Sequence, residues 1–112
     1  MPLPSLLRLA AGLMLLLNAS FTVAEDAPAS NGQKIYEETC DGCHGGGIGG
    51  WFSGAPKTGE KEEWAPLIEK GLPTLLESTL KGVGKMKPNG GCEQCTEADI
   101  RAAVEYMVEQ SQ

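Results

Sequence analysis

The sequence predicts an all-α protein with about four helices and two glycine-rich loops. Apolar residues recur at helical spacing in several segments, and no segment shows convincing alternation of apolar and polar residues. Clusters of glycine mark the places where the helical patterns stop. A length of 112 residues without an internal repeat fits a single domain.

The first 24 residues have the pattern of a signal peptide. Arg8 is the only charged residue before Glu25, and residues 9–17 form a leucine-rich apolar run. The segment closes on Thr22-Val23-Ala24, which suits a signal peptidase. An uncleaved membrane anchor is the alternative, although the apolar run is shorter than the roughly 20 residues of a spanning helix.

Cleavage after Ala24 implies an exported, periplasmic protein. A polar leader is then expected over residues 25–31 and one domain over residues 32–112. Membrane association would occur only through an uncleaved N-terminus, or as a loose attachment of the exported domain. These boundaries are expectations from composition alone.

The chain is acidic, with 15 Asp and Glu residues against 9 Lys and Arg residues and a net charge of −6. This balance argues against a nucleic acid partner, because phosphates attract basic surfaces. Aromatic residues make up only 5% of the chain, so it has few large side chains for a core. A buried prosthetic group would supply the missing apolar volume.

The first helix is expected to start at Ser30 or Asn31, both of which are good N-caps. The five glycines within residues 45–50 should end it, with a loop continuing through Pro56. Four positions of this helix should share one face at spacings i, i+4, i+8 and i+11: Gly32, Tyr36, Cys40 and Cys43.

Three further helices are expected. Residues 60–70 and 74–81 carry apolar residues at helical spacing, and each segment is followed by a glycine. A second glycine-rich loop covers residues 82–91. The last helix starts at Thr96, with Asp99 at capping-box spacing. Its apolar stripe is expected to contain Ile100, Ala103, Val104 and Met107.

The motif Cys40-Asp41-Gly42-Cys43-His44 is the C-x-x-C-H signature of covalent haem attachment. Two thiols on one helical turn can both reach the vinyl groups of one ring edge, which places the following histidine below the iron. One haem c bound through Cys40 and Cys43, with His44 as iron ligand, is therefore expected. Pairing of this motif with Cys92 and Cys95 in a zinc site is the alternative, which export disfavours.

Two further residues are candidates for the haem site. Pro56 lies twelve residues after His44, where its carbonyl could orient the imidazole, although an ordinary loop proline fits the spacing equally well. Met86 lies in a loop where no helical packing explains an apolar side chain, whereas Met107 lies on a helix stripe. Met86 is thus the expected sixth iron ligand, against an open or water-ligated iron.

Cys92 and Cys95 have no histidine after them and cannot form a second haem motif of the ordinary kind. A mutual disulfide is the simplest interpretation in an oxidising compartment. A redox-active dithiol is the alternative, because the pair precedes a helix N-terminus that would stabilise a thiolate.

The chain resembles the class I cytochromes c, and most closely the small bacterial cytochrome c5 type. The resemblance covers about residues 32–107, and its motifs are the C-x-x-C-H segment, Gly54-Ala55-Pro56, Trp64-Ala65-Pro66, Met86, and residues 90–96. It implies the class I cytochrome c fold around one haem, and it supports the Pro56 and Met86 roles and the disulfide. It also implies that Gly32 and Tyr36 cross the last helix, with Tyr106 as the aromatic partner. Lys87 and Leu67 depart from the type, which often has proline and arginine there.

The expected function is electron transfer, with the iron cycling between Fe(II) and Fe(III) under His/Met ligation, and not an enzymatic reaction. A peroxidase-like haem enzyme or a sensor with an open sixth site is the alternative. The expected partners are a redox donor and a redox acceptor. They would dock at Lys81, Lys85 and Lys87, unless these lysines are simply solvated.

Overall fold

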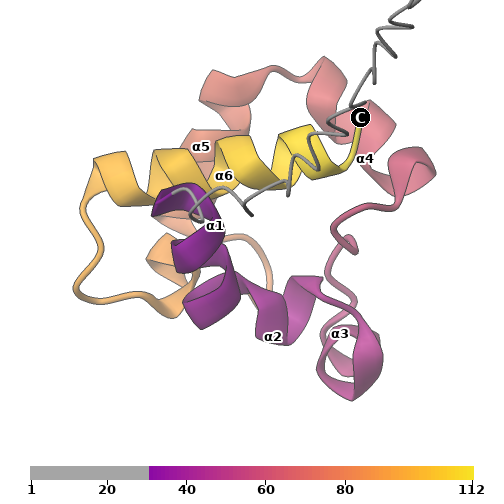
Figure 1. Cartoon of the computed structure of the whole chain (residues 1–112), viewed down its shortest axis with the longest axis horizontal. Coiled ribbons are helices and arrows are strands. Elements are labelled where there is room, and N and C mark those ends of the chain that lie inside the picture. Colours follow the sequence, from indigo (N-terminus) through magenta and orange to yellow (C-terminus); the bar gives the residue numbers. More distant parts are fainter. Residues whose placement is uncertain (1–30) are drawn as a thin grey trace, which may run out of the picture.

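The computed structural model describes residues 31–112, which are helical apart from loops and one isolated bridge (Figure 1). The expected signal peptide over residues 1–24 and nearly all of the leader lie outside the described residues. The all-α class predicted from the sequence is confirmed. The elements, in chain order, are α1 (Asn31–Ile35), η1 (Tyr36–Cys40), α2 (Asp41–His44), α3 (Gly47–Ser53), α4 (Lys61–Glu69), α5 (Leu72–Lys81), η2 (Pro88–Gly91) and α6 (Glu97–Gln110).

The first predicted helix exists, but its middle turn, η1, is a π-helix between α1 and α2. Tyr36 is buried and Cys40 packs against the same apolar cluster, whereas Cys43 is exposed. The π-turn therefore interrupts the regular helical spacing from which the shared face was predicted. A π-turn closes its hydrogen bonds over five residues instead of four, so it changes the phase of the helix before the second cysteine.

The crossing of α1 over α6 depends on a glycine. A Cβ atom on Gly32 would lie only 2.1 Å from the carbonyl oxygen of Ala102, so a side chain does not fit there. Next to this contact the rings of Tyr36 and Tyr106 lie 5.3 Å apart between centroids, at an angle of 49°. The contact of Gly32 and Tyr36 with the last helix, implied by the resemblance, is present in the structure.

The glycine-rich segment after His44 is not entirely a loop, as the sequence led us to expect. Gly45 ends the first helix as predicted, but residues 47–53 then form the short helix α3. Two of its glycines face the backbone of α2, since a Cβ atom on Gly49 would lie 2.2 Å from the oxygen of Gly42. Absent side chains let the two helices approach closely, which compensates for the low helix propensity of glycine.

The two middle helices agree closely with the prediction. Glu60 is the N-cap residue of α4 and makes no side-chain capping bond. The helix ends at Glu69, and Gly71, two residues later, has a positive φ of 86°. Helix α5 begins at Leu72, two residues before the predicted start, because Pro73 is well suited to a first helical turn.

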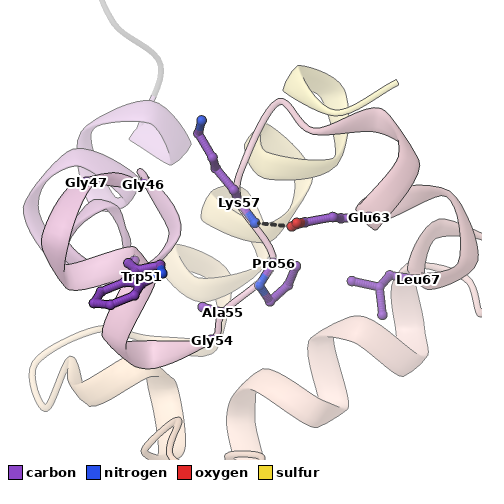
Figure 2. Close-up of a pocket in the computed structure, with 10 residues that line it drawn as sticks. Gly46, Gly47, Trp51, Gly54, Ala55, Pro56, Lys57, Glu63 and Leu67 are labelled. Carbon is purple, nitrogen blue, oxygen red and sulfur yellow. Dashed lines mark hydrogen bonds between the residues drawn. The ribbon is translucent and has the colours of Figure 1, made fainter.

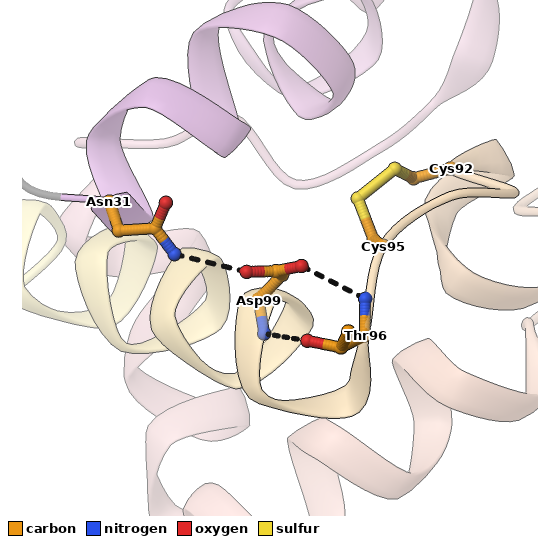
Figure 3. Close-up of a disulfide and its surroundings, with 5 residues drawn as sticks. All are labelled: Asn31, Cys92, Cys95, Thr96 and Asp99. Atoms are coloured by element: carbon orange, nitrogen blue, oxygen red, sulfur yellow. Dashed lines mark hydrogen bonds between the residues drawn. A yellow bond between two sulfur atoms is a disulfide. The ribbon is translucent and has the colours of Figure 1, made fainter.

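The start of α6 has the predicted capping box (Figure 3). Asp99 N donates to the Thr96 hydroxyl at 3.2 Å, and Thr96 N donates to the Asp99 carboxylate at 2.9 Å. Cys92 and Cys95 form a disulfide directly before this cap, with Cα atoms 5.5 Å apart. Asn31 also donates to Asp99 at 3.1 Å, so the cap connects α6 to the first helix.

The core has two clusters, and α6 contributes to both. The first contains Leu76, Cys92, Ile100 and Val104. The second contains Tyr36, Trp64 and Met107. Burial of all four predicted positions of the α6 stripe is confirmed. Burial of Cys92 in the first cluster fits a structural role for its disulfide. Among residues 31–112, no helix has the length and apolar character needed to cross a membrane.

Substitution of Gly32 tests the helix crossing. Gly32→Ala should lower the free energy of unfolding by about 1–3 kcal/mol, because the methyl group forces α1 away from the carbonyl of Ala102. Gly42→Ala is the control, since nothing lies within 4 Å of a Cβ atom there. This control should be neutral or stabilise by roughly 0.5 kcal/mol. Denaturant unfolding of both variants measures the difference, and equal effects would contradict the proposed constraint.

Candidate functional site

The C-x-x-C-H residues occupy the end of the first helix. Cys40 ends η1 and is half-buried, Cys43 is exposed, and both are free thiols in the structure. Burial, followed by the charge of Cys43, raises the pKa of Cys40 to about 11. His44 ends α2 and is buried, with an exposed fraction of 8%. The turn therefore presents two thiols and one imidazole in sequence.

The imidazole of His44 is fixed by a hydrogen bond to Pro56. Its Nδ1 atom lies 2.8 Å from the carbonyl oxygen of Pro56. A carbonyl can only accept, so Nδ1 must carry a proton, and in the neutral imidazole Nε2 then keeps its lone pair. That is the tautomer in which a histidine binds a metal through Nε2.

Several hydrogen bonds hold the segment that provides this acceptor. Thr58 N donates to the carbonyl oxygen of His44 at 2.8 Å. This bond joins the two ends of the segment that contains Pro56. The indole nitrogen of Trp64 donates to Lys57 O at 2.9 Å, and Lys57 N donates to the Glu63 carboxylate at 2.8 Å. Helix α4 thus positions the histidine ligand indirectly.

The end of α6 adds a further support for this segment. The Ser111 hydroxyl accepts from Gly59 N at 2.9 Å and donates to Met107 O at 2.7 Å. Ser111 is also the least exposed of the polar side chains described as buried, at 1%. The sequence reasoning did not identify Ser111, Trp64 or Glu63 as supports. The Trp64-Ala65-Pro66 motif was the one available signal, and it did not indicate which group the indole would bind.

Met86 belongs to a separate tight loop. Val83 and Met86 exchange two backbone hydrogen bonds, of 3.1 and 2.8 Å, around a turn in which Gly84 has a positive φ of 57°. The Met86 side chain is half-buried. The following segment, η2, contacts η1, the turn that ends in Cys40. The segment that follows Met86 thus lies against the helix of the haem motif.

A pocket of about 680 Å³ opens between α3 and α4, beside Pro56 (Figure 2). Trp51 lies on its α3 side and Leu67 on its α4 side, while the Lys57–Glu63 hydrogen bond closes one rim. Met86 does not line this pocket. Its walls are formed by Gly46, Gly47, Gly50, Trp51, Gly54, Ala55, Pro56, Lys57, Glu63 and Leu67.

The three lysines predicted to dock a partner differ in their surroundings. Lys81 forms an ion pair with Glu77 one turn earlier in α5, and this hydrogen-bonded charge lowers the pKa of Glu77. Lys85 and Lys87 are exposed and have no salt bridge within residues 31–112. The positive charge of this loop therefore comes mainly from Lys85 and Lys87.

These side chains fit a covalent haem. Two free thiols precede a buried histidine whose Nε2 is available, and its Nδ1 has a carbonyl acceptor. The zinc alternative needs four thiols in one site, but Cys92 and Cys95 are joined to each other. Residues 31–112 also contain no group of three or more His, Cys, Asp or Glu side chains suited to a metal ion.

Comparison with known proteins agrees with this donor set. The family model described as cytochrome C oxidase, cbb3-type, subunit III matches residues 27–107. Cytochrome c-555 of Chlorobaculum tepidum is 38% identical over 103 residues, covering 86% of this chain and 92% of that protein. Cytochrome c5 of Ectopseudomonas mendocina is 31% identical, covering 70% of this chain and 88% of that protein.

Solved structures give the same result. A chain in the electron transfer complex of nitrite reductase with cytochrome c is 40% identical, with a TM-score of 0.67; the match covers 75% of this chain and 98% of that one. The mono-haem ferrocytochrome c from Shewanella putrefaciens is 34% identical, with a TM-score of 0.61, covering 77% of this chain and all of that one (100%). The fold and the donor set together define a class I cytochrome c.

The chain belongs to the small class I cytochromes c, the group that includes cytochrome c5 and cytochrome c-555. It carries one covalently bound haem c and functions in electron transfer. The alternatives of a peroxidase-like enzyme or a sensor are not favoured by these relatives.

Proposed function

We propose that this chain is an exported electron carrier and not an enzyme. In this proposal the haem is attached through Cys40 and Cys43, with His44 and Met86 as the axial ligands of the iron. The bound haem supplies an iron that alternates between Fe(II) and Fe(III). The observation that carries the proposal is the 2.8 Å hydrogen bond between His44 Nδ1 and Pro56 O.

His44 acts as a fixed ligand in this proposal. The Pro56 carbonyl holds the imidazole in one tautomer and one orientation, and it makes Nε2 a better donor. Because His44 is the only histidine, no second imidazole remains for general acid or base catalysis. This shortage supports a carrier that transforms no substrate.

Met86 is the proposed sixth ligand because the burial of Met107 supports a packing role for that residue. Met107 is buried in the core cluster with Tyr36 and Trp64, where its thioether fills space between helices. Met86 is the one other methionine of residues 31–112, and η2, the segment that follows it, contacts η1. A His/Met pair favours electron transfer and raises the reduction potential.

Mass spectrometry tests export and attachment together. The intact mass of the denatured protein should equal residues 25–112 plus one haem, since thioether bonds survive denaturation. The double variant Cys40→Ala/Cys43→Ala should lose the covalent haem mass. Conversely, a haem that dissociates from the denatured wild-type protein would rule out attachment at these thiols, and a mass that includes residues 1–24 would rule out cleavage.

Optical spectroscopy tests the sixth ligand. The ferric protein should show the weak far-red band of methionine–iron charge transfer, and Met86→Ala should remove it, lower the potential and admit external ligands. Met107→Ala is the control and should retain the band, although loss of a buried side chain should cost about 2–5 kcal/mol of stability. Retention of the band in Met86→Ala would show that another group binds the iron.

We further propose that Lys85 and Lys87 orient an acidic redox partner. They form a positive patch on a chain of net charge −6, so the molecule has a dipole. Lys81 contributes less, because Glu77 pairs with it. A relative of this chain has been crystallised in an electron transfer complex with nitrite reductase, which supports a protein partner of the redox class.

Kinetics with such a partner test the lysine patch. The rate constant should fall as ionic strength rises, because salt screens charges over about 10 Å at 0.1 M. Lys85→Glu/Lys87→Glu should slow the reaction without changing the reduction potential. Lys61→Glu/Lys70→Glu, at exposed positions of α4 and its C-cap, is a control of equal charge. A rate that increases with salt would indicate repulsion between net charges and remove the patch from the docking site.

A further inference from the structure

Helix α3 exposes an unusual amount of apolar surface. The exposed fractions of Ile48, Trp51 and Phe52 are 78%, 80% and 68%. Among residues 31–112 only one other large apolar side chain, Val83, is comparably exposed. The rings of Trp51 and Phe52 contact edge to face, 5.0 Å apart between centroids, so they form one small aromatic surface.

The opposite side of α3 packs against the haem-attachment turn and is hydrogen-bonded to it. A Cβ atom on Gly50 would lie 3.1 Å from the carbonyl oxygen of Cys43, and the Ser53 hydroxyl donates to that oxygen at 3.3 Å. Because glycines occupy the side that faces α2, all three large side chains of α3 lie away from α2, and Trp51 also lines the pocket beside Pro56. In Figure 1 this short helix projects from the lower right of the molecule, next to α2.

The chain segment that carries this surface is uncharged. Residues 45–56 contain no Asp, Glu, Lys or Arg, although charged residues make up 21% of the chain. The neutral segment adjoins Cys43, which is itself exposed. A protein that docks on the outer face of α3 therefore removes water from no charged side chain of this segment, a step that would cost free energy. The charges of Lys57 and Glu63 lie at the pocket that Trp51 also lines.

We propose that the outer face of α3, formed by Ile48, Trp51 and Phe52, is a docking surface for a redox protein with an uncharged, apolar surface beside its own redox centre. One electron passes between the two molecules, reducing one and oxidising the other, and no bond forms or breaks. The proposal rests on haem attachment at Cys43, because that attachment places the redox centre behind α3.

The size of the surface fits a short-lived complex. Stable complexes bury roughly 800 Å² on each partner, which is more than three side chains supply. Electron-transfer complexes are typically smaller and weaker than this. A large hydrophobic interface would slow dissociation, whereas a carrier must leave its partner after each transfer.

Electron self-exchange provides the test, because a second copy of the chain presents the same uncharged surface. Mixtures of reduced and oxidised protein are compared by NMR line broadening at an ionic strength that screens the net charges. Trp51→Ser/Phe52→Ser should lower the self-exchange rate constant at least fivefold. Val83→Ser, the exposed apolar control outside α3, should stay within about twofold. Each variant should react at the wild-type rate with a small inorganic oxidant.

A second variant adds a salt-dependent readout. Trp51→Glu should slow self-exchange most at low ionic strength, and added salt should restore part of the rate. Unchanged self-exchange in the double variant, or an equal fall in Val83→Ser, would overturn the proposal. A shift of the visible spectrum or of the potential in the α3 variants would also overturn it, since these rings would then pack on the porphyrin. Loss of covalent haem from the wild-type protein would instead contradict attachment at Cys43.

Discussion

The hydrogen bond from His44 to the carbonyl of Pro56 is the constraint on which the site depends. It fixes the tautomer and orientation of the one histidine of the chain, and it joins two segments separated by twelve residues. The bond requires that Pro56 stay in place, and Trp64, Glu63 and Ser111 contribute to that through neighbouring backbone atoms. Two distant helices, α4 and α6, therefore help to position a ligand that neither contains.

Close contact between backbones is the second feature of this fold. The first helix meets α6 at Gly32, and α3 meets α2 at Gly49 and Gly50. A chain with few aromatic residues gains compactness in this way without large side chains. The same use of glycine has a consequence at α3, whose aromatic residues find no room against α2 and remain exposed.

The sequence predicted the features that are encoded locally. The capping box at Thr96 and Asp99, the ends of the middle helices, and the buried stripe of α6 all follow from the spacing of a few residues. The π-turn at Tyr36 and the helix at residues 47–53 could not be predicted, because tertiary contacts decide them against local propensity. A helix predicted from apolar spacing is assumed to have a constant number of residues per turn, and glycine clusters normally indicate loops.

The candidate site likewise has some residues that the sequence identifies and others that only the structure shows. The C-x-x-C-H motif and Met86 were found from residue type and position, and Pro56 was one of two alternatives that spacing could not separate. The hydrogen bond from His44 selects between them in the structure. The supports from Lys57, Trp64 and Ser111 involve backbone atoms, which carry no sequence signal.

The π-turn in the first helix has a consequence for changes in chain length. A π-turn contains one residue more than an α-turn, so the helix holds one residue that regular hydrogen bonding does not need. Deleting a residue within Tyr36–Cys40 would let the helix become regular throughout while the cysteine turn kept nearly the same orientation relative to Gly32, because an α-turn with one residue fewer covers nearly the same rotation. The number of residues between the helix crossing at Gly32 and the cysteine turn can thus differ by one, because the π-turn takes up the extra residue.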